Sequence, residues 1–262
     1  MKVALLALLI LVATNVLAQP AKSVFLDEFT WTELRDQVAA GKTTIIVPIG
    51  GTEQSGPHMA LGKHNVRAKV LSGKIASELG NALVAPVVAY VPEGAIAPPS
   101  QHMRFPGTVT VPDDAFEKTL ESAARSFRLH GFRDIVFLGD HGGYQKNLVA
   151  VANRLNREWV KTAARAHAIR EYYDAADTAY AEGLKRLGIS AEAIGTHAGL
   201  ADTSLALAID PSLVRGDRLA DPPSARDGVN GDPRKASAEL GRIGVDLVVA
   251  STVEAIRKAT RR

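Results

Sequence analysis

The chain has 262 residues, no cysteine, and 31 Lys and Arg against 28 Asp and Glu. The absence of cysteine excludes disulfides and a lipid-modified cysteine, so stability has to come from the core. The basic residues are scattered between acids, which argues against a nucleic-acid partner.

Residues 1–18 have the pattern of a signal peptide. Lys2 precedes the apolar run 3–13, and Val16-Leu17-Ala18 ends in a small residue, as cleavage sites do. The run is shorter than the ~20 apolar residues of a membrane helix, and no later stretch approaches that length. We therefore expect an exported protein, periplasmic or secreted, with no membrane partner after cleavage and a mature chain of residues 19–262. An uncleaved N-terminal anchor is the alternative.

The mature chain alternates short apolar runs with longer amphipathic ones, which is typical of a single α/β domain. The expected strands are 43–49, 82–88, 134–138 and 167–173, and the expected helices are 66–79, 112–130, 145–164, 176–187, 200–208 and 236–259. This β-α-β-α order predicts a largely parallel sheet covered by helices on both faces. The segment 210–234 is rich in Pro, Gly and Asp and is predicted to be mostly loop.

Two segments that follow expected strands carry unusual residues, and ligand sites in such sheets lie beyond the carboxyl ends of strands. After 43–49, the sequence GGTEQSGPHMALGKH contains Glu53, His58 and His64; after 134–138, GDHGG contains Asp140 and His141. Carboxylate and imidazole are ligands of zinc and manganese sites. The chain has no H-E-x-x-H motif. Spacing alone therefore leaves two interpretations open, a metal site or histidines that are hydrogen-bonded for structural reasons.

Five sequence blocks are more specific together than any one of them alone. They are 53–62 (EQSGPHMALG), 102–108 (HMRFPGT), 140–143 (DHGG), 197–204 (HAGLADTS) and 228–233 (GVNGDP). In this order they resemble the motifs E-Q-H-G-P-H-L-P-L-G-T-D, H-x-x-F-P-G-T, N-G-H-G-G-N, H-A-G-x-x-E-T-S and G-x-x-G-D-P of the creatininase (creatinine amidohydrolase) family. The resemblance extends from about residue 45 to the terminal helix.

The resemblance implies a three-layer α/β/α fold, a homo-oligomer that is commonly a hexamer, and two adjacent divalent metals that activate a water to attack an amide carbon. Family members open the creatinine ring, remove formyl groups from formamides, or trim a modified peptide. The family positions that match Glu53, His64 and His141 hold the first metal. Those that match Ser55, His64 and Asp202 hold the second.

Two of these implied ligands differ in this chain. Ser55 replaces a histidine, and His64 stands where a bridging aspartate is expected. A carboxylate can join two cations, whereas a neutral imidazole offers one free nitrogen. We therefore predict a single divalent metal (Zn, Mn or Fe) on Glu53, His64 and His141, and two metals are the alternative. Asp202 is expected to be a fourth ligand or to orient the bound water.

Further site residues follow from family position. His197 is the candidate general acid for the leaving nitrogen, a task that imidazole suits at neutral pH, and Asp202 is the second catalytic candidate. His58, His102 and Tyr144, which replaces the asparagine that ends the glycine-rich block, are the candidate substrate-binding residues. The alternative for His197 is a hydrogen-bonded residue of the loop before a helix. For His58 and His102 it is a role in orienting their turns.

The leading hypothesis is a metal-dependent amidohydrolase that acts on a small-molecule amide, either a cyclic amide such as creatinine or a formamide. One alternative is a degenerate relative that binds a ligand or has a structural role, which the changes at Ser55 and His64 favour. The other is a hydrolase of a lactone or a small peptide. The loop 211–234 is long for a compact domain, and we expect it to form a lid or a subunit contact near Asp232.

Overall fold

The computed structural model describes residues 23–261, which are built around a parallel sheet. Its four strands within these residues are β1 (Thr44–Ile49), β2 (Ala82–Val84), β3 (Asp134–Gly139) and β4 (Arg165–Ala168). Their order across the sheet is β2-β1-β3-β4, and every pairing is parallel. Ile45 of β1 is in register with Leu83 on one side and with Ile135 on the other.

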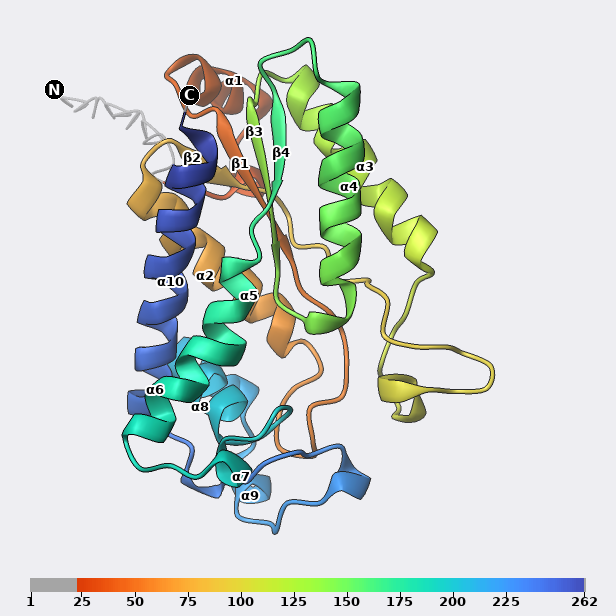
Figure 1. Ribbon diagram of the computed structural model, residues 1–262, viewed down its shortest axis with the longest axis vertical. Coiled ribbons are helices and arrows are strands. Elements are labelled where there is room, and N and C mark those ends of the chain that lie inside the picture. The colour runs from red at the N-terminus through yellow and green to blue at the C-terminus, as the bar shows by residue number, and fades with distance from the viewer. Residues whose placement is uncertain (1–22, 262) are drawn as a thin grey trace, which may run out of the picture.

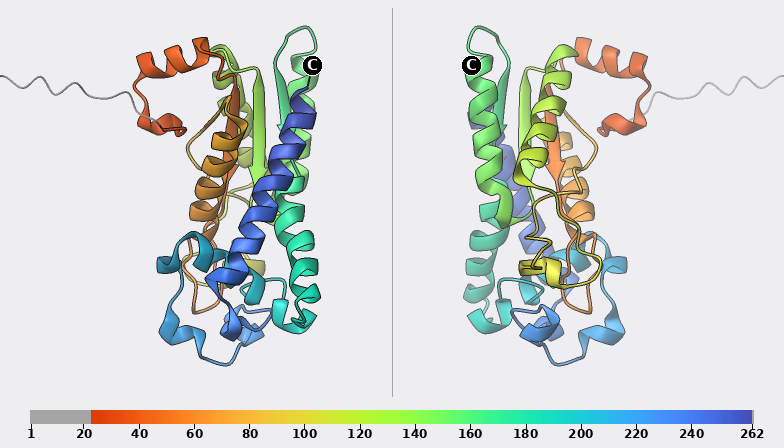
Figure 2. Two further views of the ribbon diagram at one scale, coloured as in Figure 1. Left: turned by 90° about the vertical axis from the view of Figure 1, so that its left-hand side faces the viewer. Right: turned by 90° about the vertical axis from the view of Figure 1, so that its right-hand side faces the viewer.

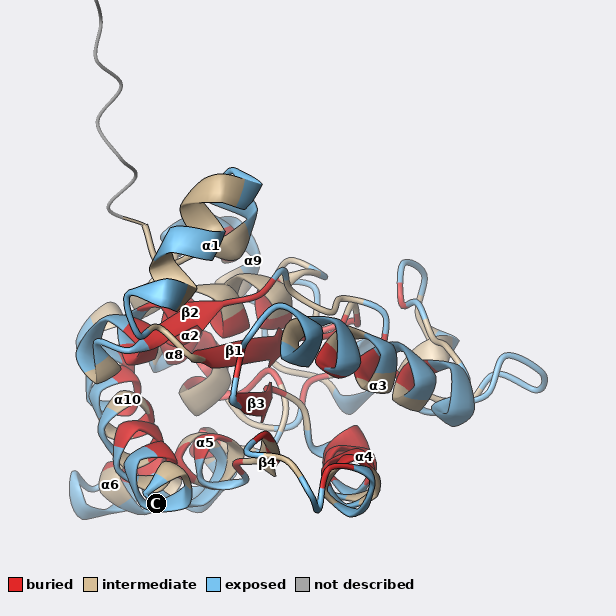
Figure 3. Cartoon of the chain, turned by 90° about the horizontal axis from the view of Figure 1, so that it is seen from above, coloured by how far each residue is buried: buried red, intermediate tan, exposed pale blue. Residues whose placement is uncertain are grey.

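Residues that alternate along the central strands belong to two separate cores, one on each face of the sheet. Figure 3 shows the buried strands between the helices that cover the two faces. Ile45 and Phe137 pack under α3 (Asp113–Leu129) and α4 (Gln145–Glu158), and α1 (Trp31–Ala39) adds apolar side chains to this core. Ile46 and Val136 face the opposite core. Because both faces are buried, β1 and β3 are continuous apolar runs rather than alternating ones.

The helices that pack on the core of the opposite face form the second helical layer (Figure 1). They are α2 (Lys63–Leu79), α5 (Glu171–Asp174), α6 (Tyr180–Arg186), α8 (Leu200–Ile209) and α10 (Ala238–Thr260). A π-helical turn, Ala175–Ala179, joins α5 to α6, and the short helices α7 (Ala191–Ile194) and α9 (Gly216–Leu219) belong to connections. The expected three-layer α/β/α arrangement is confirmed.

The expected elements agree with the structure best in the centre of the sheet, where β1 and β3 match their predictions to within one residue. The helix expected at 66–79 begins three residues earlier, at Lys63, which brings His64 into its first turn. The predicted helix 145–164 ends at Glu158, and the predicted strand 82–88 pairs regularly only as far as Val84. The segment 210–234 is mostly loop, with short helical turns.

The predicted strand 167–173 is wrong beyond Ala168, because α5 begins at Glu171. The adjacent tyrosines favour a strand only weakly, since β-propensity depends on packing. In the helix, Tyr172 is buried and its hydroxyl donates a hydrogen bond to Asp140 Oδ1 (2.7 Å). Tertiary contact thus overrides the local preference.

Within residues 23–261, no helix is both long and apolar enough to cross a membrane. The predicted signal peptide, residues 1–18, lies outside the described part of the chain.

The winding of the chain determines where a site can form. The connection from β1 to β2 passes through α2 on one face, and the connection from β2 to β3 passes through α3 on the other. The winding therefore reverses between β1 and β3, and ligand sites of open α/β sheets lie at the carboxyl ends of the strands at such a point. Figure 2 shows that the loop near residue 100 (yellow) and the segment 210–235 (blue) both lie toward this end of the molecule.

Candidate active site

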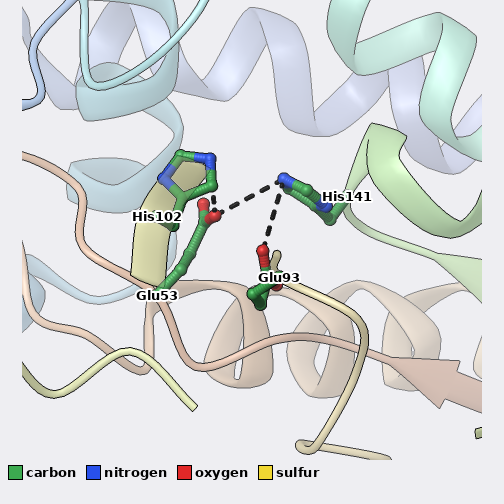
Figure 4. A group of neighbouring side chains, drawn as sticks. All are labelled: Glu53, Glu93, His102 and His141. Carbon is green, nitrogen blue, oxygen red and sulfur yellow. Dashed lines mark ion pairs between the residues drawn. The ribbon is translucent and has the colours of Figure 1, made fainter. Parts of the chain in front are cut away.

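Four side chains from three connections meet beyond the carboxyl ends of β1 and β3. Glu53 follows β1, Glu93 and His102 belong to the connection between β2 and α3, and His141 follows β3. Each offers one donor atom, and these atoms all lie within 4.8 Å of one another. Figure 4 shows the side chains of this donor group converging, with Glu53 between the two histidines.

The two carboxylates of the donor group have few partners. Glu53 Oε2 lies 3.2 Å from His102 Nε2 and 3.4 Å from His141 Nε2, and Glu93 Oε2 lies 3.8 Å from His141 Nε2. Glu53 Oε2 and both oxygens of Glu93 are buried and accept no hydrogen bond from the described residues. Burying a carboxylate without a partner is costly. A cation held by these oxygens and by two imidazoles removes that cost, so the donor set fits a divalent metal of the zinc or manganese type.

Burial and neighbouring charges shift the pKa values of the acids and of His141 in the donor group. Burial and the neighbouring Glu53 carboxylate raise the pKa of Glu93 to about 9. Burial opposes ionisation of Glu53 as well, but a hydrogen bond and positive charge from His64 hold the pKa of Glu53 below its ordinary value. Burial lowers the pKa of His141 to about 4, so its ring is neutral at pH 7. Neutral imidazole is the form that binds metals.

The rings of His141 and His102 each have a neighbour at Nδ1, the ring nitrogen that faces away from Glu53. The N–H of Gly143 donates to His141 Nδ1 (3.1 Å), and the Gln54 side-chain nitrogen lies 3.0 Å from His102 Nδ1. These contacts fix the orientation of the two rings. In this geometry His141 accepts at Nδ1, so its ring proton is on Nε2; a cation on Nε2 would require the proton on Nδ1 and a different partner there than the Gly143 N–H.

His64 and Asp202, the other two predicted ligands, lie beside the donor group in a network of buried ion pairs. His64 Nε2 is 2.8 Å from Glu53 Oε1, and its Nδ1 is 2.6 Å from Asp140 Oδ2, so both ring nitrogens have carboxylate partners. Asp202 is paired with Lys63, and its Oδ1 accepts a hydrogen bond from Arg67 (2.8 Å). The structure thus brings Glu53, His64 and His141 together, places Glu93 and His102 with them, and pairs Asp202 with Lys63 and Arg67. A ligand role for His64 and Asp202 stays a prediction.

Arg67 is the centre of this ion-pair network. Its Nε donates to Asp140 Oδ2 and its Nη1 to Asp202 Oδ1, each at 2.8 Å. Asp140 also accepts from His64 and from Tyr172. The network holds His64 against Glu53 Oε1 and so determines which Glu53 oxygen faces the two histidines of the donor group.

A cavity of about 170 Å³ adjoins the donor group. His141 and His197 line it, together with Lys63, Asp202 and Tyr173. His197 lies with its Nδ1 3.9 Å from Glu53 Oε1, and its Nε2 is 3.0 Å from the Gln54 carbonyl. Burial and the charge of Lys63 lower the pKa of His197 to about 4, so at pH 7 its ring is neutral and can accept a proton.

The candidate substrate-binding residues occupy different positions. His102 belongs to the donor group, and its ring centroid is 4.7 Å from that of His197. His58 is buried, with its Nε2 3.0 Å from the Thr203 hydroxyl. Tyr144 is fully buried, and its hydroxyl accepts the N–H of Asp140 (3.0 Å) and lies 2.6 Å from the Gly50 carbonyl. Neither His58 nor Tyr144 lines the cavity, and substrate binding by them stays a prediction.

The loop 211–234 contacts the segments that carry His58 and His197. The N–H of Arg215 donates to the His58 carbonyl (2.7 Å), and Asn230 exchanges backbone hydrogen bonds with His197. Gly228 has φ +76°, and a Cβ there would lie 2.1 Å from Gln54 Oε1, so this approach requires glycine. Asp232 pairs with Arg234 within the loop. Roles as a lid or a subunit contact stay predictions.

Sequence reasoning missed Glu93, Lys63, Arg67 and Tyr172. Glu93 is the only charged residue in 85–99, an otherwise apolar segment rich in proline that follows a strand. That isolation was a usable signal. Lys63 and Arg67 are four residues apart and so share a helix face, which becomes informative only once the helix is known to begin at Lys63.

Comparison with known proteins decides the family. The model of the Creatininase family, described as creatinine amidohydrolase, matches residues 27–256. The chain belongs to the creatininase family. The prediction made from the five sequence blocks is confirmed.

Two curated creatininase relatives show the range of the similarity. Creatinine amidohydrolase of Pseudomonas putida is 28% identical over 262 residues, which cover 91% of this chain and 98% of that protein. Mycofactocin precursor peptide peptidase of Mycolicibacterium smegmatis is 31% identical over 180 residues, which cover 67% of this chain and 61% of that protein. The family relationship therefore includes hydrolases of different substrates.

Solved creatininases share the fold of this chain. A crystal structure of creatinine amidohydrolase matches with a TM-score of 0.77 at 27% identity. Structures described as "Creatininase Mn" and as a "Zn-Zn type" mutant creatininase match with TM-scores of 0.76 and 0.75 at 26% and 27% identity. Each comparison covers 92% of this chain and 100% of the solved chain. This creatininase-family hydrolase thus has solved neighbours that carry manganese or zinc.

Proposed function

We propose that the protein is a metal-dependent amidohydrolase that uses one divalent cation to cleave the C–N bond of a small non-peptide amide, either a cyclic amide such as creatinine or a formamide. The observation that carries the proposal is the donor group of Glu53, Glu93, His102 and His141, in which three buried carboxylate oxygens accept no hydrogen bond from the described residues. The similarity to creatinine amidohydrolase supports the class of reaction.

The donor group, His197 and Gln54 have different roles in the proposed reaction. Glu53, Glu93, His102 and His141 would hold the cation, which would lower the pKa of a bound water from about 15.7 to about 7. His197 borders the cavity with a neutral ring. It accepts a proton from the attacking water and donates it to the leaving nitrogen. Gln54 orients both His102 and His197.

Cavity size favours a small amide over a peptide. The cavity beside the donor group has a volume of about 170 Å³. Pockets for drug-sized ligands are larger, about 300–1,000 Å³. A compact ring or a short formamide suits this space better than an extended chain.

A relative that binds a ligand without hydrolysing it is the second candidate, and the positions of the second-metal residues favour it. The Ser55 hydroxyl is buried and makes no hydrogen bond with the described residues. Asp202 is already paired with Lys63 and Arg67. Where catalysis depends on a second cation held by these residues, the chain lacks the means to hold it.

A substrate panel separates the candidates. The metal-loaded protein is incubated with creatinine, N-formyl amides, a lactone and dipeptides, before and after removal of the metal with a chelator. We expect turnover of creatinine or a formamide that is lost with the chelator and restored by Zn, Mn or Fe. Binding without turnover of any compound supports the ligand-binding candidate, and turnover of only the lactone or the dipeptides refutes the non-peptide amide assignment.

A further inference from the structure

Lys63 is a buried cation beside the candidate metal centre. Its side chain is 2% exposed, whereas lysine is almost never fully buried unless it is paired. It is also the first residue of α2, whose first turn contains no acid. A positive charge there opposes the helix dipole. Burial and position both disfavour a lysine, and residues that break local rules in this way concentrate at functional sites.

One carboxylate anchors the Lys63 ammonium. Among residues 23–261, its ion pair is with Asp202, and Asp202 is itself fixed by Arg67 (2.8 Å) and by the N–H of Ala198 (3.1 Å). An ammonium has three N–H donors. One of them serves Asp202, and the lysine lines the cavity together with His141 and His197. The remaining N–H groups are available to an oxygen atom in that cavity.

The charges around the cavity are arranged in two groups. Lys63 and Arg67 balance Asp202 and Asp140 on the side of α2. On the other side, Glu53 and Glu93 face the imidazoles of His102 and His141. A substrate in the cavity would lie against Lys63 and against His141, the member of the donor group that lines the cavity.

We propose that Lys63 is a catalytic residue whose ammonium donates a hydrogen bond to the carbonyl oxygen of the substrate amide. This inference rests on the proposed function. When water attacks, its oxygen bonds to the carbonyl carbon, its proton passes to His197, and the π electrons of the carbonyl move onto the carbonyl oxygen. Lys63 keeps its protons and stabilises that oxyanion. The carbonyl then re-forms, the C–N bond breaks, and the leaving nitrogen takes the proton from His197.

The first test is Lys63→Met, which keeps the length of the side chain and removes its charge. Removing one oxyanion donor typically lowers kcat about 10²–10³-fold. We expect that loss with KM changed less than about threefold, because the interaction strengthens in the transition state. The cation content of the variant should equal that of the wild type. Lys69→Met is the matched control, since Lys69 lies on the same helix with a side chain that is 44% exposed; its kcat should be unchanged.

A double-mutant cycle that combines Lys63→Met with Asp202→Asn distinguishes a catalytic role of Lys63 from a role in neutralising Asp202. If Lys63 only neutralises Asp202, adding Lys63→Met to the Asp202→Asn protein leaves kcat unchanged. If Lys63 contacts the substrate, the double variant is at least tenfold slower in kcat than Asp202→Asn alone. Equal rates for these two proteins would overturn the inference.

Binding of inorganic phosphate gives a readout besides activity. Titration calorimetry on the metal-loaded proteins should give a Kd at least tenfold higher for Lys63→Met than for the wild type, at equal cation content. An unchanged Kd together with wild-type kcat refutes the role of Lys63 and leaves the proposed function intact. A wild-type protein that neither holds a cation nor hydrolyses an amide refutes the proposed function, and the role of Lys63 with it.

Discussion

Glu93 is a buried acid whose two carboxylate oxygens accept no hydrogen bond from the described residues. Because Glu93 lies in the donor group, we expect a cation to be its partner. Glu93→Gln removes the charge with little change in shape. We expect it to weaken cation affinity by more than the ~10–100-fold that loss of a supporting residue costs. Competition with a chelator of known affinity measures the change.

Asp202→Asn is the matched control for Glu93, because the sequence predicted Asp202 as a ligand and the structure pairs it with Lys63 and Arg67. Its cation affinity should stay within about threefold of the wild type. A protein that loses the cation on Asp202→Asn and keeps it on Glu93→Gln would restore the ligand set predicted from the sequence.

Arg67 tests how far the ion-pair network contributes to stability. Arg67→Met leaves Asp140 without the guanidinium and Asp202 with Lys63 alone, both in a buried setting. Breaking a buried pair in this way costs about 3–5 kcal/mol. Urea denaturation should show a loss of that size in the free energy of unfolding. Arg35→Met, at an exposed pair with Asp36, should change it by less than about 0.5 kcal/mol; equal losses in the two variants would contradict the account.

At the residue level, the sequence indicated those site residues whose position follows from a strand end. Glu53 and His141 come directly after strands that are recognisable as apolar runs, and both lie in the donor group. His102 was indicated by resemblance, with a different role. Glu93 depends on the path of an irregular loop, which no periodicity describes. The partners of His64 depend on Asp140, 76 residues away.

The packing of α8 against α10 requires glycine at one contact. A Cβ on Gly241 of α10 would lie 1.8 Å from the carbonyl oxygen of Ser204 in α8. Alanine is the better helix former by about 1 kcal/mol, so local propensity favours Gly241→Ala. Overpacking at a backbone contact costs about 1–3 kcal/mol and more when the backbone has to shift. We expect a net loss of at least about 1 kcal/mol by thermal or urea denaturation.

Gly183 of α6 is the matched control for Gly241. A Cβ there has no neighbour closer than 3.8 Å, so Gly183→Ala should stabilise the protein by about 0.5–1 kcal/mol. Stabilisation by both substitutions would show that the two helices are farther apart than described.

At the element level, the central strands were predictable because both of their faces are buried, which makes each of them an uninterrupted apolar run. The end of β4 was not predictable from the sequence. His167 to Tyr173 has strand-forming residues, but Tyr172 gains a buried hydrogen bond to Asp140 only as part of a helix. The start of α2 was placed too late, because neither Lys63 nor His64 is apolar.

For the whole molecule, element order predicted a parallel sheet but not the strand order β2-β1-β3-β4. That order places the reversal of winding between β1 and β3, and so the end of the sheet where Glu53 and His141 meet. The pattern of one sequence does not specify which strands are neighbours, because pairing depends on contacts between distant segments.

At the level of the whole chain, we propose that the protein is exported and that residues 1–18 direct the export. Expressed with its own N-terminus in a Gram-negative host, the protein should accumulate in the periplasm with Gln19 as its first residue. N-terminal sequencing of that fraction checks this. A protein that retains Met1 in the membrane fraction would support the uncleaved anchor instead.

The central claim is that Glu53, Glu93, His102 and His141 together hold one divalent cation. Elemental analysis of the purified protein, after exposure to Zn or Mn and removal of free metal, tests it most directly. The account predicts one cation per chain in the wild type and less than about a tenth of that in His141→Ala. A wild-type protein with no tightly bound cation, or a His141→Ala variant that retains the full content, would contradict it.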